Sequence, residues 1–205
     1  MTDEGTVYTG LEILIQGPAG EAIDAWRSRY DQTYPELEPH ISLAYPPFVP
    51  FEQWKQVKPA LVACLEAFEQ FPILFNTPGF FQANSPIEPH VLWLKPEDGG
   101  MLERIRRTLE KEFPNFVPPM PSSYIPHVSI GFIQGDEALQ EALARVRAEM
   151  KPFEFEVTEV VYEVDDKAHH HKFLDVMPLC VPSSLRLPHM RGINALAGED
   201  QTNFE

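Results

Sequence analysis

The segment PHVSIGF, residues 126–132, repeats an earlier segment, PHISLAY at 39–45, position by position. Each begins with Pro-His, continues with a β-branched aliphatic residue and Ser, and ends with an aliphatic, a small and an aromatic residue. Alternate side chains of a β-strand point to opposite faces. Both segments therefore predict a strand with His, Ser and the small residue on one face and the other residues on the opposite, apolar face. We expect the two polar faces to line a cleft between two halves of the molecule.

The elements predicted around these segments follow the same order on either side of residues 83–89. Apolar periodicity and turn residues predict strand, helix, strand, helix, strand, and then the same series with one further strand. The predicted strands are 7–16, 39–45, 71–82 (interrupted at Pro78 and Gly79), 89–96, 126–133, 153–164 and 171–179, and the predicted helices are 21–32, 51–68, 101–113 and 137–150. The last two strands should form a hairpin. This order indicates a duplicated α+β chain.

The length of 205 residues and the hydrophobic content of 43% suit a single domain with a sizeable core. We assign residues 1–180 to one domain made of two pseudo-symmetric halves, with the seam near 83–89. Residues 181–205 contain few large apolar residues and no periodicity, so we expect a poorly ordered C-terminal tail there.

The formal net charge of −15, with a pI near 4.8, argues against binding of long nucleic acids, which requires clustered Lys and Arg. The two cysteines do not make a disulfide framework, and the acidic N-terminus does not read as a secretory signal. We therefore expect a cytoplasmic protein. No apolar run reaches the ~18 residues typical of a membrane span, so no membrane partner is expected.

A single His-x-Ser triplet carries little information, because short motifs recur by chance. PHVLWL at 89–94 contains His90 but has Leu92 where the hydroxyl would be, so we interpret His90 as a strand residue without a chemical role. DDKAHHH at 165–171 invites a metal-site interpretation. Adjacent histidines on an extended chain point to opposite faces, however, so we favour a solvated turn, from which Lys172 or a histidine of the turn could reach an anion in the cleft.

The two His-x-Ser motifs carry more information than these single features, because they occupy equivalent positions in the two halves. A pair of such motifs, one in each half of a duplicated chain, resembles the 2H phosphoesterase superfamily. That superfamily includes the 2′-5′ RNA ligases and the 2′,3′-cyclic nucleotide phosphodiesterases. The resemblance covers about residues 6–180 and is carried by His40-Ile41-Ser42-Leu43 and His127-Val128-Ser129-Ile130. Many members have Thr where this chain has Ser, and both residues supply a hydroxyl.

The resemblance implies a bilobal fold in which two β-sheets face a central cleft with helices packed outside. It also implies a reaction that needs no metal or other cofactor, with His40, Ser42, His127 and Ser129 as the catalytic residues. Two histidines on opposite sides of a phosphodiester could supply the base that activates water and the acid that protonates the leaving ribose oxygen. The two hydroxyls would stabilise charge on the phosphoryl oxygens.

We therefore expect a metal-independent phosphodiesterase acting on 2′,3′-cyclic phosphates or related small nucleotide phosphodiesters, with a bell-shaped pH profile. Which histidine is the base stays open. The alternatives are an enzyme acting on 2′-5′-linked oligonucleotides or RNA ends, and a module that binds a nucleotide or RNA terminus without turnover. We expect a monomer. Candidate stacking platforms for a base are Tyr45, Phe81, Trp93 and above all Tyr124, which directly precedes the second motif.

Overall fold

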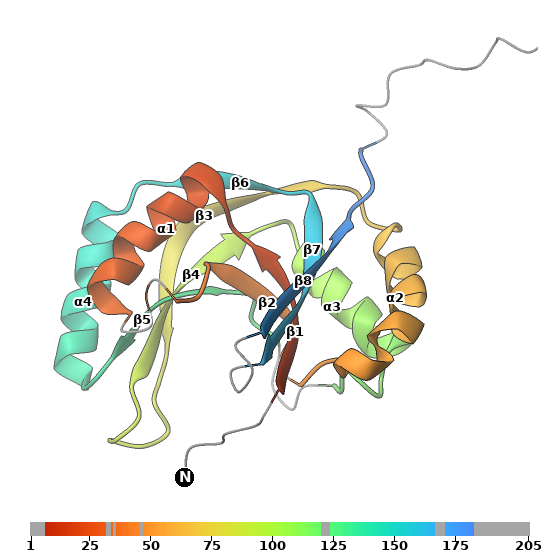
Figure 1. Ribbon diagram of the computed structural model, residues 1–205. Coiled ribbons are helices and arrows are strands. Elements are labelled where there is room, and N and C mark those ends of the chain that lie inside the picture. The colour runs from red at the N-terminus through yellow and green to blue at the C-terminus, as the bar shows by residue number, and fades with distance from the viewer. Residues whose placement is uncertain are drawn as a thin grey trace, which may run out of the picture.

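The computed structural model describes residues 7–31, 34, 36–45, 47–119, 124–166 and 171–182, and within these ranges the chain forms two four-stranded antiparallel sheets with four helices (Figure 1). The first sheet has the order β2-β1-β7-β8 and consists of β1 (Val7–Leu14), β2 (His40–Ala44), β7 (Glu159–Asp166) and β8 (His171–Pro178). The second sheet has the order β5-β4-β3-β6 and consists of β3 (Phe71–Phe81), β4 (His90–Glu97), β5 (Val128–Ile133) and β6 (Phe153–Val157). The helices are α1 (Gly17–Tyr30), α2 (Phe51–Leu65), α3 (Met101–Glu112) and α4 (Asp136–Glu149).

The predicted α+β fold with two sheets is therefore confirmed, as is the predicted hairpin of β7 and β8. No helix in the described part of the chain is long and apolar enough to cross a membrane. The tail predicted at 181–205 lies outside the described residues from position 183 onward.

The two halves of the sequence exchange elements in space. Helix α1 follows a strand of the first sheet but packs against β5 and β6 of the second sheet, beside α4 (Figure 1). Helix α3 follows a strand of the second sheet but packs against β2 of the first sheet, near α2. The loop at 82–89, in the middle of the predicted repeat, joins β3 to β4 within the second sheet. Each sheet with its helices thus combines segments from both halves of the sequence.

The single strand predicted at 153–164 is wrong, because this segment forms two strands in different sheets. β6 pairs with β3 and β7 pairs with β1, and Thr158 joins them. The sequence contains the signal for this break. The apolar residues of β6 occupy odd positions, whereas Val160, Tyr162 and Val164 of β7 are buried at even positions. A change of phase in the alternation means that the chain cannot continue on the same face of one sheet.

The predicted interruption at Pro78 and Gly79 is also wrong, since β3 runs through both residues. β6 pairs with β3 only from Phe71 to Phe75, so the rest of β3 has β4 as its one neighbour in the sheet. A strand with a free edge tolerates a residue without an N–H group. Gly79 is required for another reason, because Trp93 lies across it and leaves no room for a Cβ atom.

A one-residue bulge follows the serine of each motif, at the same place in both sheets. In the first sheet Ser42 pairs with Glu12 but Ala44 pairs with Leu11, and in the second sheet the pairs are Ser129 with Trp93 and Gly131 with Leu92. Leu43 and Ile130 are the additional residues, and both are fully buried. A bulge places two residues of one strand opposite one residue of its partner, which reverses the alternation beyond it.

The prediction that the small residues Ala44 and Gly131 share the face of the histidines is wrong, because the bulge before each of them reverses the alternation. Both are buried. Gly131 lies directly against Tyr30 of α1, and a Cβ atom there would collide with the Cβ atom of Tyr30. Phe132, predicted on the apolar face, is instead 38% exposed. The small residues therefore allow a helix to approach the strand instead of leaving room for a substrate.

We expect the Gly131→Ala variant to be less stable than the wild type by about 1–3 kcal/mol, the usual cost of an additional methyl group in a closely packed contact. The free energy of unfolding should be measured by urea denaturation. Phe132→Leu, a change at the exposed neighbouring position, is the control and should have a much smaller effect. Equal unfolding midpoints for Gly131→Ala and wild type would show that α1 does not pack here as described.

Candidate active site

The two motif histidines are oriented in the same way by their own backbone. The Nδ1 atom of His40 lies 2.9 Å from the carbonyl oxygen of Glu38, and that of His127 lies 2.8 Å from the carbonyl oxygen of Ile125. A carbonyl oxygen only accepts hydrogen bonds, so Nδ1 carries the proton in both rings. The Nε2 atom is then the position where each imidazole gains or loses a proton. His40 begins β2 and His127 directly precedes β5, and these two strands, each at the edge of its sheet, lie next to each other.

Two cavities meet at His40. The first, which we call the acidic cavity, has a volume of about 260 Å³ and is lined by Tyr8, Gly10, Glu12, Leu14, Leu37, Glu38, His40, Ser42, Glu163, Asp165 and Lys172. The second, which we call the shared cavity, has a volume of about 230 Å³ and is lined by Arg27, Asp31, Leu37, Glu38, Pro39, His40, Ser129 and Phe132. The shared cavity brings the histidine of one motif together with the serine of the other. Three of the four residues predicted from the motifs, His40, Ser42 and Ser129, therefore line these two cavities. His127 lines neither cavity but lies close enough to His40 to interact with it electrostatically.

His127 lies in aromatic surroundings. The ring of Phe81 packs edge-on against its imidazole with the centroids 4.8 Å apart, and the Trp93 ring centroid is 6.2 Å away. Burial lowers the pKa of His127 below its usual value of 6.5, although the hydrogen bond to Ile125 opposes this, and the nearby His40 lowers it further. The physical cause is that an apolar environment disfavours the charged form. His127 is therefore neutral near pH 7.

His40 has acidic surroundings instead. Oε1 of Glu12 lies 3.9 Å from Nε2 of His40, and Glu12 is only 7% exposed. The carboxyl group of Glu163 contacts that of Glu12, and Lys172 forms an ion pair of 3.2 Å with Glu163. Burial, with Glu163 adding to it, raises the pKa of Glu12 to about 7, although the charges of His40 and Lys172 oppose this rise.

The residues that create these different surroundings occupy equivalent positions of the two sheets. Glu12 pairs with Ser42 in the first sheet, and Trp93 pairs with Ser129 in the second. One strand further, Glu163 pairs with Gly10, and Phe81 pairs with Val91 at the matching point of the second sheet. His40 thus has two carboxyl groups in its surroundings, and His127 has two aromatic rings at the equivalent positions.

Sequence reasoning did not single out Glu12 or Glu163. The sequence contains no clear signal for Glu12, because a polar residue between Leu11 and Ile13 also fits a strand with one face in water. The suggestion that Lys172 approaches the cleft agrees with its place in the lining of the acidic cavity. Residues 167–170 of the histidine-rich stretch lie outside the described residues. The described residues contain no group of three or more His, Cys, Asp or Glu side chains arranged to hold a metal ion.

The predicted stacking residues lie in three different settings. Phe81 contacts His127, as described above. The hydroxyl of Tyr124 donates a hydrogen bond of 2.9 Å to the carbonyl oxygen of Ser42, and burial raises the pKa of that hydroxyl strongly. Tyr124 therefore connects the segment before β5 to β2. Tyr45 is 40% exposed and lies close enough to Arg106 and Tyr124 to interact with them electrostatically. A stacking role for these rings stays a prediction.

His90 is buried and has the opposite proton arrangement. Its Nδ1 atom accepts a hydrogen bond of 3.0 Å from the backbone N–H of Ala83, so its proton is on Nε2, which lies 3.2 Å from Oδ1 of Asp136. These bonds connect the β3–β4 loop to the start of α4. A buried, fully partnered histidine of this kind suits a structural role.

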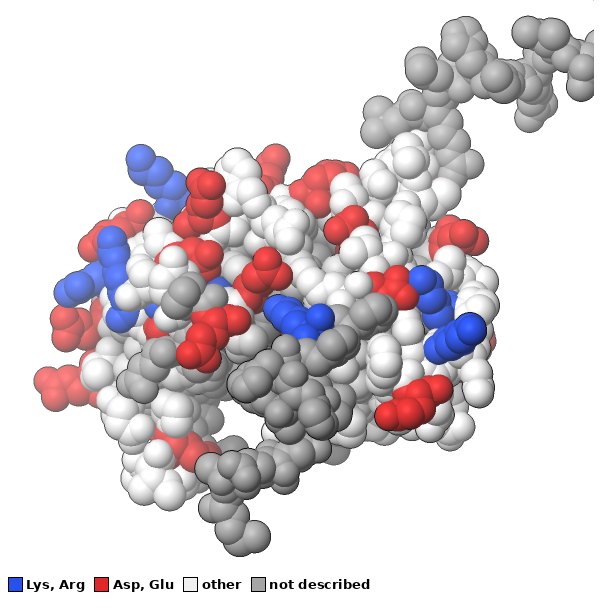
Figure 2. Space-filling model, viewed as in Figure 1, with Lys and Arg blue, Asp and Glu red and all other residues white. Residues whose placement is uncertain are grey.

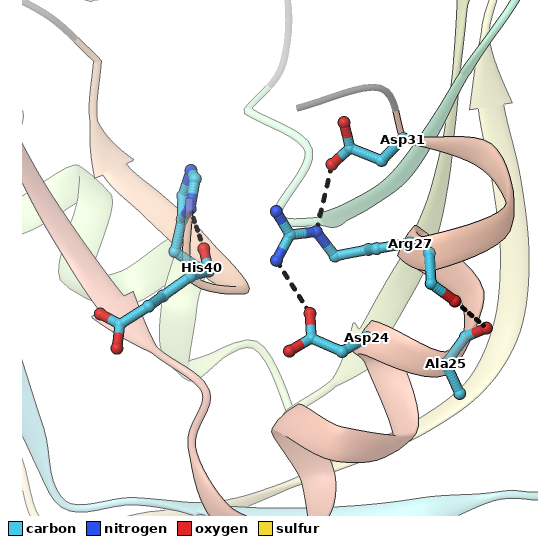
Figure 3. Close-up of polar contacts among 7 residues, drawn as sticks. Asp24, Ala25, Arg27, Asp31 and His40 are labelled. Atoms are coloured by element: carbon cyan, nitrogen blue, oxygen red, sulfur yellow. Dashed lines mark hydrogen bonds and ion pairs between the residues drawn. The ribbon is translucent and has the colours of Figure 1, made fainter. Parts of the chain in front are cut away.

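Arg27 of α1 is a further residue of the site that sequence reasoning missed. Figure 3 shows its guanidinium group between Asp24 and Asp31 and directed toward His40. The ion pairs measure 2.9 Å to Asp24 and 3.2 Å to Asp31, and Arg27 is buried. Because two carboxylates offset its charge, Arg27 can stay buried at the C-terminal end of α1, where it lines the shared cavity together with His40.

On the face shown in Figure 2, basic side chains are scattered among more extensive acidic ones and do not form a continuous stripe among the described residues. Binding of a long phosphate backbone requires such a stripe. A small anionic ligand requires only local donors.

Comparison with known proteins identifies the family. Over 112 residues the chain is 30% identical to "Putative phosphoesterase GK0864" of Geobacillus kaustophilus (strain HTA426), and this segment is 53% of the chain and 59% of that relative. The chain thus matches less than two thirds of that protein's length. The fold is similar to TT0787 of Thermus thermophilus, with a TM-score of 0.58, 12% identity, and coverage of 83% of this chain and 94% of that one.

The fold is also similar to E. coli LigT, with a TM-score of 0.51, 17% identity, and coverage of 87% of this chain and 99% of LigT. LigT has been crystallised in complexes with NADP⁺ and 3′-AMP. These similarities agree with the two-sheet fold. The family model of the 2′-5′ RNA ligase superfamily matches residues 15–168, which include both motifs, so the chain belongs to that superfamily.

The raised pKa of Glu12 predicts how stability depends on pH. The pKa is 4.5 in the unfolded chain and about 7 in the folded one. Between these values the unfolded chain has lost the proton that the folded chain keeps, so wild-type stability falls as pH rises. Glu12→Gln removes this dependence. Urea denaturation should show the variant gaining roughly 3 kcal/mol relative to wild type between pH 4.5 and pH 8. A difference that does not change with pH would contradict the described environment of Glu12.

Proposed function

We propose that this protein is a phosphodiesterase that hydrolyses 2′,3′-cyclic phosphates or related small nucleotide phosphodiesters, with His40 and His127 as general acid and general base. The observation that carries the proposal is the pair of histidines from matched strands, each with Nδ1 bound to its own backbone and Nε2 left for proton transfer. Family membership supports a phosphoester substrate. The binding of NADP⁺ and 3′-AMP by LigT supports a small nucleotide ligand.

The different surroundings of the two histidines support an assignment of their roles. His127 is neutral near pH 7 because aromatic burial lowers its pKa, so its Nε2 atom accepts a proton from the attacking water. His40, beside the carboxyl group of Glu12, donates the proton of Nε2 to the leaving ribose oxygen. One P–O bond forms and one breaks, and the product is a phosphomonoester with a free ribose hydroxyl. General acid–base catalysis of this kind contributes about 10²–10⁴ in rate.

The two motif serines suit the stabilisation of the transition state. Ser42 and Ser129 lie two residues after the histidines and before the bulges, and they line the two cavities that share His40. Hydroxyl groups held in this way donate hydrogen bonds to the phosphoryl oxygens as negative charge develops on them. Removal of one such donor typically lowers kcat by about 10²–10³.

Action on 2′-5′ linkages or RNA ends is the second candidate, and the family to which the chain belongs favours it. The chemistry would be the same, since a ribose hydroxyl leaves phosphorus in both cases. The acidic lining beside His40 and the net charge of −15 favour small substrates over long RNA.

The first test is hydrolysis of the four nucleoside 2′,3′-cyclic phosphates in excess EDTA, followed by phosphorus NMR. Wild type should turn over, and His40→Ala and His127→Ala should each lose at least about 10²-fold in kcat. His90→Gln is the matched control, because His90 belongs to a structural network, and it should stay active although less stable. Full activity of either motif variant would exclude the two-histidine mechanism. If wild type turns over no cyclic phosphate but cleaves 2′-5′-linked dinucleotides, the second candidate is correct.

The pH profile tests the role of His127. Because its pKa lies below 6.5, the acid limb of kcat/KM should lie below that pH. Phe81→Ser would admit water beside the ring, raise the pKa of His127 toward its usual value, and move the acid limb to higher pH. Phe81→Leu keeps the site apolar and should leave the limb in place. If Phe81→Ser moves the alkaline limb instead, His127 is the acid and the two roles are exchanged.

A further inference from the structure

One of the two carboxyl oxygens of Glu12 has no hydrogen-bond partner. Its Oε2 atom is enclosed and receives no hydrogen bond from the described residues, although buried polar atoms normally have partners. Its Oε1 atom is directed to His40, at 3.9 Å from Nε2. Gly10 leaves the necessary space, because a Cβ atom there would come within 3.0 Å of Oε1. An apolar residue such as the neighbouring Leu11 or Ile13 would fill a strand position without this cost, so a functional reason for the carboxyl group is required.

Further charged side chains of the acidic cavity connect Glu12 to an exposed residue. The carboxyl group of Glu163 lies close to that of Glu12, and two neighbouring carboxyl groups favour sharing one proton unless positive groups offset both of their charges. Nζ of Lys172 lies 3.2 Å from Oε1 of Glu163, and the Lys172 side chain is 43% exposed. The series His40, Glu12, Glu163, Lys172 thus leads from the reacting imidazole to solvent.

The net charge of these four groups is zero whether the proton is on the carboxyl pair or on His40. When the carboxyl pair holds the proton, the pair has one negative charge and Lys172 offsets it. When Nε2 of His40 holds the proton, both carboxylates are charged, and the imidazolium and Lys172 offset them. The sum is zero in both states, so the transfer creates no uncompensated charge in the buried site. Trp93 and Phe81, which occupy the equivalent positions beside His127, cannot hold a proton.

We propose that Glu12 and Glu163 form a proton store that returns a proton to His40 after each turnover, which makes His40 the general acid of the reaction. This inference rests on the proposed function. In the reaction the N–H bond at Nε2 breaks as the O–H bond of the leaving ribose hydroxyl forms. The O–H bond of Glu12 then breaks as Nε2–H forms again, after a rotation of the carboxyl group that closes the 3.9 Å gap. A proton from water restores the carboxyl pair through Glu163, and the proton taken up by His127 returns to water.

Several other groups face Glu12 or line the same cavity and belong to its electrostatic environment. They come from every element that packs around it: Tyr8 on its own strand, Glu38 and His40 at the start of β2, Glu163 and Asp165 on β7, and Lys172 on β8. Glu38 and Asp165 are further acidic groups of this cavity. Lys172 favours its ionisation.

The kinetic test is the pH dependence of kcat/KM for wild type, Glu12→Gln and Glu163→Gln. Loss of the store should move the alkaline limb to lower pH by about one unit, so that activity at pH 8 falls about tenfold, because a shift of one unit changes the protonated fraction tenfold. At pH 6 water supplies the proton directly and the loss should be about twofold or less. Glu159→Gln, at an exposed position of the strand that carries Glu163, is the matched control and should keep the wild-type profile. An equal loss at all pH values, or an unchanged alkaline limb in both variants, would overturn the proposal.

A second measurement does not depend on activity. Carboxyl ¹³C NMR should show the Glu12 resonance titrating near pH 7, and His40→Gln and Lys172→Met should each move that titration to higher pH, because both remove a positive partner of the carboxylate. A Glu12 titration that does not respond to either variant would overturn the proton store. If the titration responds but no phosphodiester is turned over, the cluster is correct and the proposed function fails. If turnover occurs without this response, the proposed function stands and the proton store fails.

Discussion

The cleft depends on one backbone constraint, the bulge that follows each motif serine. A regular strand would direct the next small residue into the cleft and the aromatic residue after it into the core. With the additional residue, Leu43 or Ile130 stays buried and the small residue turns toward the interior. Gly131 can then accept the close approach of α1. His40, Ser42 and Ser129, which precede the bulges, line the cavities, and the same bend in both sheets gives the two motifs equivalent positions.

The two motifs have equivalent backbone positions, but their histidines have chemically different surroundings. Hydrolysis requires one group that takes up a proton and one that releases it, and two histidines in equal environments would not be distinguished. Here the strand positions next to the motif serines carry Glu12 in one sheet and Trp93 in the other. The indole and its aromatic neighbour Phe81 exclude water around His127, whereas the surroundings of His40 are acidic. The chain thus keeps the symmetry that positions the two motifs and varies the side chains that surround their histidines.

Most of the helices and strands, and the meeting of His40, Ser42 and Ser129 at neighbouring cavities, could be predicted from the sequence, because apolar periodicity and the repeated His-x-Ser pattern are local signals. The bulges could not, since PHISLAY and PHVSIGF alternate as a regular strand would, and only the partner strand reveals the additional residue. The break at Thr158 was visible as a change of phase, but two strands in direct succession resemble one long strand. Glu12 was missed because the burial of a charged side chain depends on β7 and β8, which lie far along the chain from β1 (Figure 1).

The exchange of elements between the two sequence halves limits how such a protein can be divided or recombined. β3 belongs to the second sheet and α1 covers that sheet, although both come from the first half of the chain. Neither half therefore contains a complete sheet with its own covering helices. A chain opened in the loop at 82–89 would leave apolar faces without partners in both pieces, and each piece would need the other in order to fold. Although the sequence reads as a duplication, its halves are not modules that could be transferred separately between related proteins, and we expect the two sheets to unfold together.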